Sequence, residues 1–130
     1  MTFERTQNPR KQGDAGMGIA ISWFARQGWT VCVPLTDSQP YDLIVDDDGT
    51  LYRVSVKTTT RLTPQNTYEV SLRTKGGNQS RETVKFFDPN ESDLLFVACM
   101  DGTNYLIPTA RVEGRSTITV AGEKYADYQV

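Results

Sequence analysis

Residues 41–61 read YDLIVDDDGTLYRVSVKTTTR, two apolar runs on either side of an acidic turn. The runs at 41–45 and 51–58 are rich in β-branched and aromatic residues, which favour strands. The Asp48-Gly49 step between them is a strong signal for a tight turn, because both residues tolerate a positive φ. The sequence therefore predicts a β-hairpin here.

The hairpin register brings polar side chains together. With the turn centred near Asp48, Asp42 falls opposite Ser55, give or take one residue, and Lys57 lies close by. A carboxylate beside a lysine can hold a divalent cation while the ammonium orients or activates a water molecule against a phosphodiester. Spacing alone, however, favours the plainer alternative that Asp42 flanks a turn and Lys57 is an exposed strand residue.

The second hairpin strand alternates between a polar and an apolar face. Its polar positions are Arg53, Ser55 and Lys57, and its apolar positions are Tyr52, Val54 and Val56. The apolar set is expected to face the core. The polar face is then expected to be available to a substrate.

Outside the hairpin, hydrophobic patterning predicts one helix and further strands. An amphipathic stripe predicts a helix over 12–27, ended by Gly28. The remaining predicted strands are 29–34, 67–73, 93–100 (typical of a strand buried on both faces) and 104–107, with a polar loop and short helix over 74–92. This order predicts an α/β fold in a single domain over 1–130, although 109–130 shows no clear pattern.

The chain contains no histidine, which excludes histidine-based catalysis and metal ligation. Any chemistry must use carboxylates, lysine, hydroxyls or a metal ion. Cys32 and Cys99 lie in apolar runs and are expected to be buried, reduced thiols. No stretch approaches a membrane span, and 1–13 does not resemble a secretion signal, so a cytoplasmic protein without membrane contact is expected.

Charge is unevenly distributed along the chain. The net charge is -2, yet 53–85 carries seven basic residues against two acidic ones. The basic residues are Arg53, Lys57, Arg61, Arg73, Lys75, Arg81 and Lys85. Such a segment can hold a phosphate backbone, although it is also often only solvated strand surface.

Several segments resemble the PD-(D/E)XK nucleases, in which a strand bearing Asp turns back into a strand ending in Lys. Residues 41–61 resemble that core. KQGDAGMGIAISWFARQGWTVCVP (11–34), YEVSLRTKGGN (68–78), DLLFV (93–97) and YLIP (105–108) resemble a subgroup of small members that includes a group I intron homing endonuclease and phage or prophage relatives. The resemblance implies a restriction-endonuclease-like αβββαβ core, with a mixed central sheet flanked by helices.

The resemblance also implies site roles. Asp42 corresponds to the strand aspartate that binds Mg²⁺ (or Mn²⁺), Lys57 to the lysine that acts at the water, and the Val56 carbonyl to a further metal ligand. Two positions depart from the family pattern. Met17 stands where the helix glutamate is expected, and Ser55 where an Asp, Glu or Gln is expected two residues before the lysine. Both departures affect expected metal ligands, so the affinity for the metal ion is expected to be weaker than is usual in the family.

Asp14 lies about one helical turn before Met17. It could substitute for the missing glutamate, because positions three apart share a helix face. The interpretation of Asp14 as the helix N-cap is favoured over that role.

The expected activity is a Mg²⁺-dependent DNA endonuclease, with double-stranded DNA as partner. The residues expected to contact DNA are Arg53, Arg61, Arg73, Lys75, Asn78 and Arg81. A homodimer or homotetramer is expected, because one site per chain must reach two strands. The alternatives are a catalytically inactive DNA-binding or protein-interaction module with the same fold, and an acidic structural or regulatory protein without a nucleic-acid role.

Overall fold

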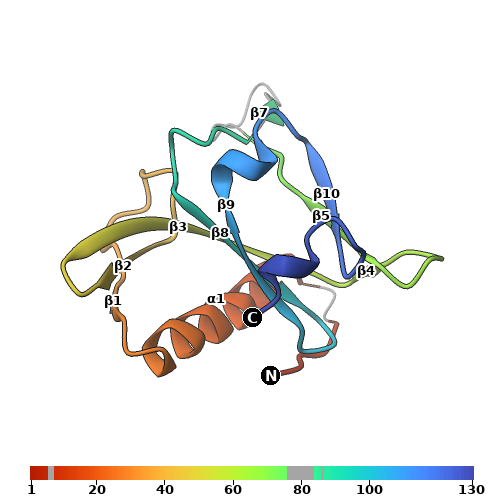
Figure 1. The fold of residues 1–130 in the computed structure, drawn as a ribbon, viewed down its shortest axis with the longest axis horizontal. Helices are drawn as coiled ribbons and strands as arrows, with labels where there is room; N and C mark the ends of the chain where they lie inside the picture. Colours follow the sequence, from red (N-terminus) through yellow and green to blue (C-terminus); the bar gives the residue numbers. More distant parts are fainter. Residues whose placement is uncertain (6–7, 76–83, 86) are drawn as a thin grey trace.

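A five-stranded sheet forms the centre of the molecule in this computed structural model, which describes residues 1–5, 8–75, 84–85 and 87–130. Its strand order is β1-β2-β3-β8-β9, with helix α1 on one face (Figure 1). The bounds are α1 Pro9–Arg26, β1 Thr30–Cys32, β2 Leu43–Asp47, β3 Thr50–Thr59, β8 Leu94–Cys99 and β9 Asn104–Pro108. The other face is covered by a three-stranded sheet of order β10-β5-β4, with β4 Arg61–Leu62, β5 Tyr68–Ser71 and β10 Thr117–Val120.

Helix α1 begins earlier than the pattern predicts. The Asn8 side chain accepts a 3.0 Å hydrogen bond from the Arg10 N–H, and Pro9 follows as the first helical residue, where its missing N–H costs nothing. The favoured interpretation of Asp14 as the N-cap is therefore wrong, since Asp14 lies inside the helix. Gly28, with φ of 86°, follows the helix end as predicted.

The hairpin of β2 and β3 is confirmed. Asp48 and Gly49 both adopt positive φ, 53° and 99°, which is the backbone of a two-residue type I′ turn. The Asp46 carboxylate accepts a 2.7 Å hydrogen bond from the Gly49 N–H and braces that turn. Local sequence therefore determines this part of the fold.

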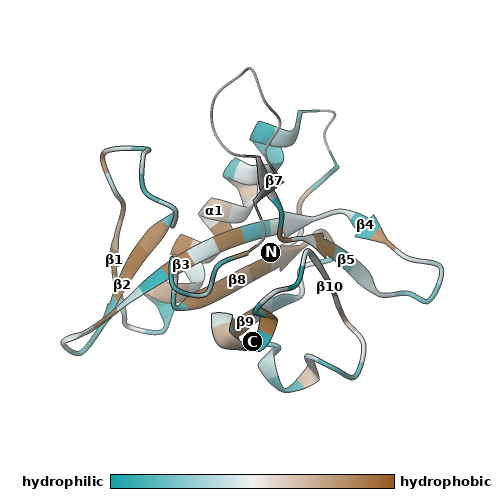
Figure 2. Cartoon of the chain, turned by 90° about the horizontal axis from the view of Figure 1, so that it is seen from above, coloured by the Kyte–Doolittle hydropathy of each residue, from teal (hydrophilic) through white to brown (hydrophobic). Residues whose placement is uncertain are grey.

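Strand β8 pairs in parallel with β3 and makes the sheet mixed. The register sets Val54 opposite Leu94 and Thr59 opposite Cys99. Apart from Leu94, every residue of β8 is buried, as predicted for the apolar run. Figure 2 shows the apolar character of β2 and β8 in brown.

Two hydrophobic cores lie on opposite faces of the central sheet. The first contains Val54 beneath α1, with Tyr52 and Val56 packed against it, so the predicted apolar face does point at a core. Helix and strand approach very closely here, because a Cβ at Gly16 would lie 1.8 Å from Cγ2 of Thr58. Glycine is the residue that permits this contact.

The second core lies between the central sheet and the three-stranded sheet. Ser55 and Lys57 pair across with Leu95 and Val97, which belong to this second core, so all four share one face. The polar side chains of β3 therefore lie on the side of the sheet that faces the second core. Ser55 is only 6% exposed, and the face is reached through a pocket.

Four further expectations are corrected. The strand predicted over 67–73 forms β5, but in the second sheet rather than the central one. Within 74–92 the structure shows the paired short strands β6 (Thr74–Lys75) and β7 (Val84–Lys85) and a turn within 87–92, whereas 76–83 and 86 lie outside the described residues. Among the described residues α1 is the only α-helix, so no second helix flanks the sheet there. Cys32 is exposed, at the edge strand, while Cys99 is buried as expected.

The remaining C-terminal segment contains the 3-10 helices η1 (Thr109–Val112) and η2 (Ala126–Tyr128) on either side of β10. It contributes Val112, Ile118, Val120 and Tyr125 to the second core. Within the described ranges, no helix combines the length and the apolar character that a membrane span requires.

Candidate active site

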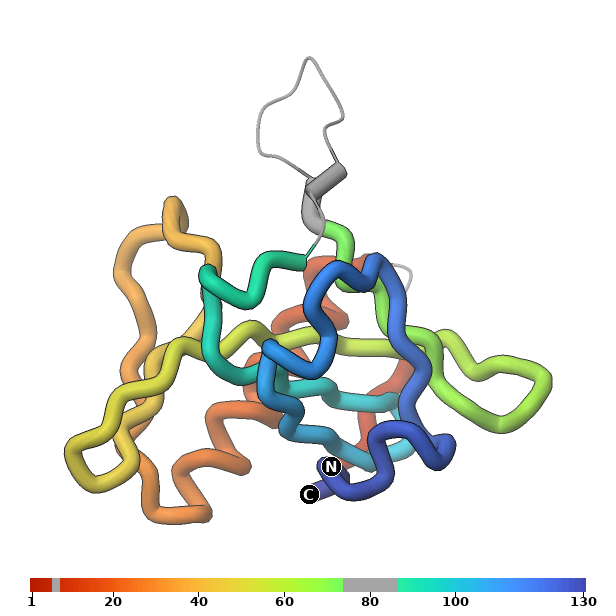
Figure 3. Tube along the Cα trace, turned by 45° about the horizontal axis from the view of Figure 1, so that its top comes forward, coloured from red at the N-terminus to blue at the C-terminus, as the bar shows by residue number. Residues whose placement is uncertain are grey.

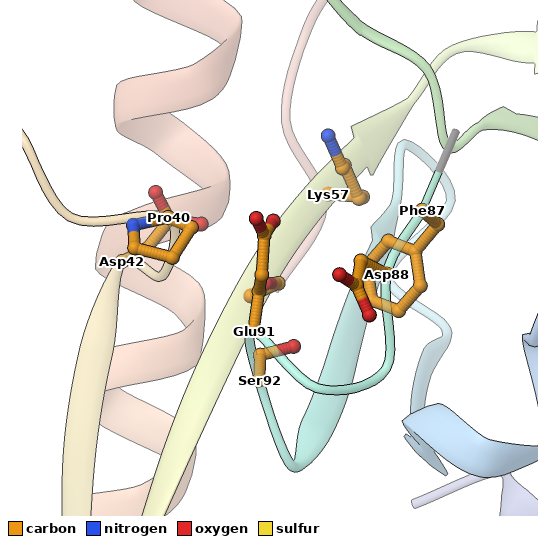
Figure 4. A pocket seen from close by; sticks show the side chains of 8 residues that line it. Pro40, Asp42, Lys57, Phe87, Asp88, Glu91 and Ser92 are labelled. Carbon is orange, nitrogen blue, oxygen red and sulfur yellow. The ribbon is translucent and has the colours of Figure 1, made fainter. Parts of the chain in front are cut away.

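Three segments line a small pocket: the residues leading into β2, the middle of β3, and the turn that precedes β8. Figure 3 traces the backbone of these three segments. The cavity volume of the pocket is about 100 Å³, enough for a few water-sized groups. The lining residues are Pro40, Asp42, Ser55, Lys57, Phe87, Asp88, Glu91 and Ser92 (Figure 4). The pocket therefore unites the three side chains that the hairpin predicts as catalytic: Asp42, Ser55 and Lys57.

Asp42 is held against β3 by two hydrogen bonds. Its backbone N–H donates to the Val54 carbonyl at 2.9 Å, and its Oδ2 accepts from the Val56 N–H at 2.7 Å. The pairing of Leu43 with Val54 puts Asp42 at the position opposite Ser55, as the sequence predicts. The side chain remains exposed, so the carboxylate is oriented without being buried.

Lys57 extends from the same face of β3 and is half-buried. Burial lowers the pKa of its ammonium from the ordinary 10.5, and the negative charge of Asp42 partly opposes that shift. Among the described residues, none accepts a hydrogen bond from Lys57 or forms an ion pair with it. A poorly solvated cation is thus held at the pocket, where its field acts strongly on an anionic group.

Asp42 also borders a second hollow, on the side of the helix. That hollow is lined by Arg10, Gly13, Asp14, Met17, Asp37, Asp42 and Val56. Met17 therefore occupies the place where a helix glutamate would face Asp42. Its thioether, packed against the helix-side core, offers no hard oxygen ligand. Asp14 reaches the same hollow from the previous turn.

Arg53 has a set of contacts that the sequence does not reveal. Its Nε and Nη2 donate to Oδ2 and Oδ1 of Asp93 at 3.2 and 3.3 Å, and its Nη1 donates to the Asn90 carbonyl at 2.9 Å. Hydrogen bonding to Arg53 lowers the pKa of Asp93 below its ordinary value, and Asp93 raises that of Arg53. Arg53 thus fastens the turn before β8 to β3.

Arg61 and Arg73, which are also expected to bind DNA, are not among the residues that line the pocket. Arg61 is 74% exposed, pairs with Glu69 at 3.3 Å and lines a different hollow. Arg73 is exposed, and Lys75 ends β6. Two further expected contacts, Asn78 and Arg81, lie outside the described residues.

Five pocket residues were not anticipated from the sequence: Pro40, Phe87, Asp88, Glu91 and Ser92. A local signal does exist, since the Asp88-Pro89-Asn90 step is typical of a turn. Nothing local, however, says that this turn lies beside Ser55. That placement follows from the parallel pairing of β3 with β8, which joins distant parts of the chain.

The groups expected from the resemblance, two side chains and one backbone carbonyl, do not by themselves fit a divalent metal ion. Asp42 supplies one carboxylate, Ser55 a hydroxyl and Val56 a carbonyl, whereas Mg²⁺ and Mn²⁺ favour several anionic oxygens. Across the part of the chain that the structure describes, no three acidic or cysteine side chains come close enough together to form a metal site.

Comparison with known proteins agrees with this architecture. The solved structure of a bacterial homing endonuclease, I-Ssp6803I, is similar with a TM-score of 0.80 and 23% sequence identity, over 92% of this chain and 87% of that chain. This likeness confirms the restriction-endonuclease-like fold and its mixed sheet. Among curated proteins, none matches. Residues 7–128 match the family model described as PD-(D/E)XK endonuclease, so the chain belongs to the PD-(D/E)XK endonuclease family.

Proposed function

We propose that this protein is an endonuclease that hydrolyses phosphodiester bonds in double-stranded DNA, with Asp42, Ser55 and Lys57 at its active site. Membership of an endonuclease family implies a DNA substrate. The observation that carries the assignment is that Asp42 and Lys57 line one pocket, on adjacent strands of a family-typical hairpin.

Lys57 and Asp42 have different roles in the proposed reaction. The Lys57 ammonium, little solvated by its surroundings, binds the scissile phosphate or a water molecule beside it and stabilises negative charge as that charge develops. The Asp42 carboxylate is kept in a fixed orientation by the Val56 N–H. PD-(D/E)XK nucleases generally use divalent metal ions, and Mg²⁺ or Mn²⁺ is the proposed cofactor. Asp42 and the Val56 carbonyl would supply two of its ligands, and further oxygens would be needed to complete its shell.

DNA contacts are proposed for basic and amide side chains of the segment 61–81 rather than for the pocket itself. The candidates are Arg61, Arg73, Lys75, Asn78 and Arg81. Arg53 is left out, because its guanidinium is committed to Asp93 and Asn90. Phosphate contacts of this kind give binding that weakens steeply with salt.

The test is incubation of supercoiled plasmid with the purified protein and Mg²⁺ or Mn²⁺. Nicking is expected, and it should disappear with EDTA and in the Lys57→Met variant. A chain that leaves the plasmid intact, while retarding duplex DNA in a salt-dependent manner, would contradict the proposed reaction.

Met17 and Ser55 favour one second candidate, a DNA- or protein-binding module that keeps the fold without the reaction. The double substitution Met17→Glu with Ser55→Gln restores the family pattern. Cleavage that appears only in this double variant would establish the binding module as the natural state. Cleavage by the unaltered chain would exclude it.

We also propose that the protein acts as a homodimer or homotetramer. The described pocket is built from one chain, and a duplex presents two strands. Light scattering at micromolar protein is expected to give at least twice the mass of a 14.6 kDa chain. A monomer that still makes double-strand breaks would count against the proposal.

A further inference from the structure

A carboxylate absent from the expected metal shell enters the pocket from the turn before β8. Glu91 is half-buried and lines the same pocket as Asp42 and Ser55. Figure 4 shows its side chain in the pocket, between Asp42 and Lys57 in this view. No hydrogen bond or ion pair joins the Glu91 side chain to another described residue.

The turn that carries Glu91 is fixed at both ends. On one side, the Asn90 N–H donates to Oδ1 of Asp88 at 2.8 Å, and the Glu91 N–H donates to the Asp88 carbonyl at 3.1 Å. On the other side, the Asp93 N–H donates to the Arg53 carbonyl at 2.9 Å, in addition to the Arg53 side-chain contacts. The backbone of Glu91 is therefore held at the rim of the pocket by the fold.

The plainer explanations for Glu91 are a solvated turn residue and a counterion for Lys57. A solvated residue would be expected to be exposed, as Asp88 and Asn90 in the same turn are, but Glu91 is half-buried. A counterion would be expected within ion-pair distance, and the salt bridges among the described residues are Arg53–Asp93 and Arg61–Glu69. Neither explanation accounts for its position.

Ser92 gives a second and independent indication of a ligand. The residue is 1% exposed, it lines the pocket, and its Oγ has no hydrogen-bond partner among the described residues. Buried hydroxyls are normally paired, because an unpaired one loses its hydration without compensation. A cation with its coordinated water in the pocket would provide that partner.

We infer that Glu91 supplies the second carboxylate that Met17 and Ser55 do not, so that Asp42 and Glu91 together bind a hard divalent cation, Mg²⁺ or Mn²⁺. Mg²⁺ is commonly held by one or two carboxylates, with water and substrate phosphates completing its shell. Two carboxylates on separate segments meet that requirement, although no group of three exists in the described chain. The site deepens the proposed nuclease function and rests on it for its purpose.

The test measures Mn²⁺ binding to the whole protein without DNA, by the electron paramagnetic resonance signal of free Mn²⁺. Glu91→Gln keeps the size of the side chain and removes its charge, so we expect a loss of affinity of about tenfold or more, as for other ligand-shell changes. Glu113→Gln alters an exposed carboxylate that does not line the pocket, and this control is expected to change affinity by less than about threefold.

Two comparisons make the result decisive. Ser55→Glu placed in the Glu91→Gln background returns a carboxylate to the strand and should restore Mn²⁺ binding. Asp14→Asn tests the rival carboxylate in the neighbouring hollow. The inference is overturned if Glu91→Gln binds like the unaltered protein, if Asp14→Asn loses more affinity than Glu91→Gln, or if no saturable binding occurs below roughly 10 mM Mn²⁺.

The cation site and the reaction can fail separately. Mn²⁺ binding that depends on Glu91, in a protein that leaves plasmid intact, would refute the proposed function and keep the site. Metal-dependent nicking that survives Glu91→Gln unchanged would keep the function and refute the site. Circular dichroism and melting temperature of each variant show that loss of binding is not loss of folding.

Discussion

The Asp42 carboxylate accepts a 2.7 Å hydrogen bond from the backbone N–H of Val56, the residue that directly precedes Lys57. One oxygen of the proposed metal-binding aspartate is therefore bound to the strand that carries the proposed catalytic lysine. The same side chain serves the fold and the chemistry. Substitutions that separate these two roles are the most informative tests of the site.

Asp42→Asn is expected to keep the fold and lose the activity. The asparagine carbonyl oxygen can accept the Val56 hydrogen bond, whereas Asp42→Ala removes the acceptor and costs about 1 kcal/mol, which corresponds to a few degrees of melting temperature. Cleavage should fall at least about 100-fold in both variants. Melting curves and plasmid nicking give the two readouts, and an asparagine variant that melts as low as the alanine variant would contradict the assigned hydrogen bond.

Lys57→Met is expected to raise thermal stability while abolishing cleavage. Burial lowers the pKa of Lys57, which means that the folded protein disfavours its charged form, and methionine fills similar space without charge. Loss of the lysine should reduce the cleavage rate by about 10²- to 10⁴-fold. The exposed Lys124→Met serves as control, and a melting temperature that falls in Lys57→Met alone would argue for a structural role.

The stability gained in Lys57→Met is expected to depend on pH. The pKa of Lys57 is lower in the folded than in the unfolded chain, so the unfolded chain binds more protons between the lowered pKa and 10.5. In that pH range the free energy of unfolding of the unaltered protein therefore rises with pH relative to that of the variant. Burial raises the pKa of Cys99 to about 11, which lowers stability above its ordinary 9.0 in both proteins and cancels in the difference. The free energies of unfolding of the unaltered protein and of Lys57→Met should therefore converge between pH 7 and 11. A difference between the two proteins that stays constant over this range would contradict the assigned pKa shift.

Gly16→Ala is expected to destabilise the packing of α1 on β3. The new Cβ would lie 1.8 Å from Cγ2 of Thr58, so helix or strand must move, at a cost of about 1 to 3 kcal/mol. Thr58→Ser removes that methyl group, and in the double variant most of the loss should be recovered. Denaturant unfolding of the four proteins gives the coupling energy, and additive effects would show that the two residues do not compete for space.

The hairpin could be predicted from the sequence because the residues that determine it are neighbours in the chain. Asp48 and Gly49 accept positive φ, and the turn they form fixes the register that sets Asp42 opposite Ser55. The start of α1 could also have been read correctly. Asn8 followed by Pro9 is a standard helix start. The periodic pattern of apolar residues begins only near Asp14, however, and this pattern favoured a later start of the helix.

The parts that sequence reasoning missed depend on pairing between distant segments. Strand alternation over 67–73 indicates a half-buried strand without saying which sheet it joins, and β5 pairs with β10 rather than with the hairpin. Glu91 looks like an ordinary turn glutamate until β8 is placed beside β3. Its contribution to the proposed site is therefore visible only in three dimensions.

The parallel pairing of β3 with β8 also sets the expected order of folding. The hairpin needs only its own residues and can form within about 1–10 μs. The contact of Arg53 with Asp93 joins positions 40 residues apart, and closing a loop of that length costs roughly 3 kcal/mol of chain entropy before any contact repays it. A nascent chain that ends before β8 thus carries Asp42 and Lys57 in a hairpin but lacks the strand that holds Glu91 beside them, so that the proposed cutting site is assembled only once β8 has paired with β3.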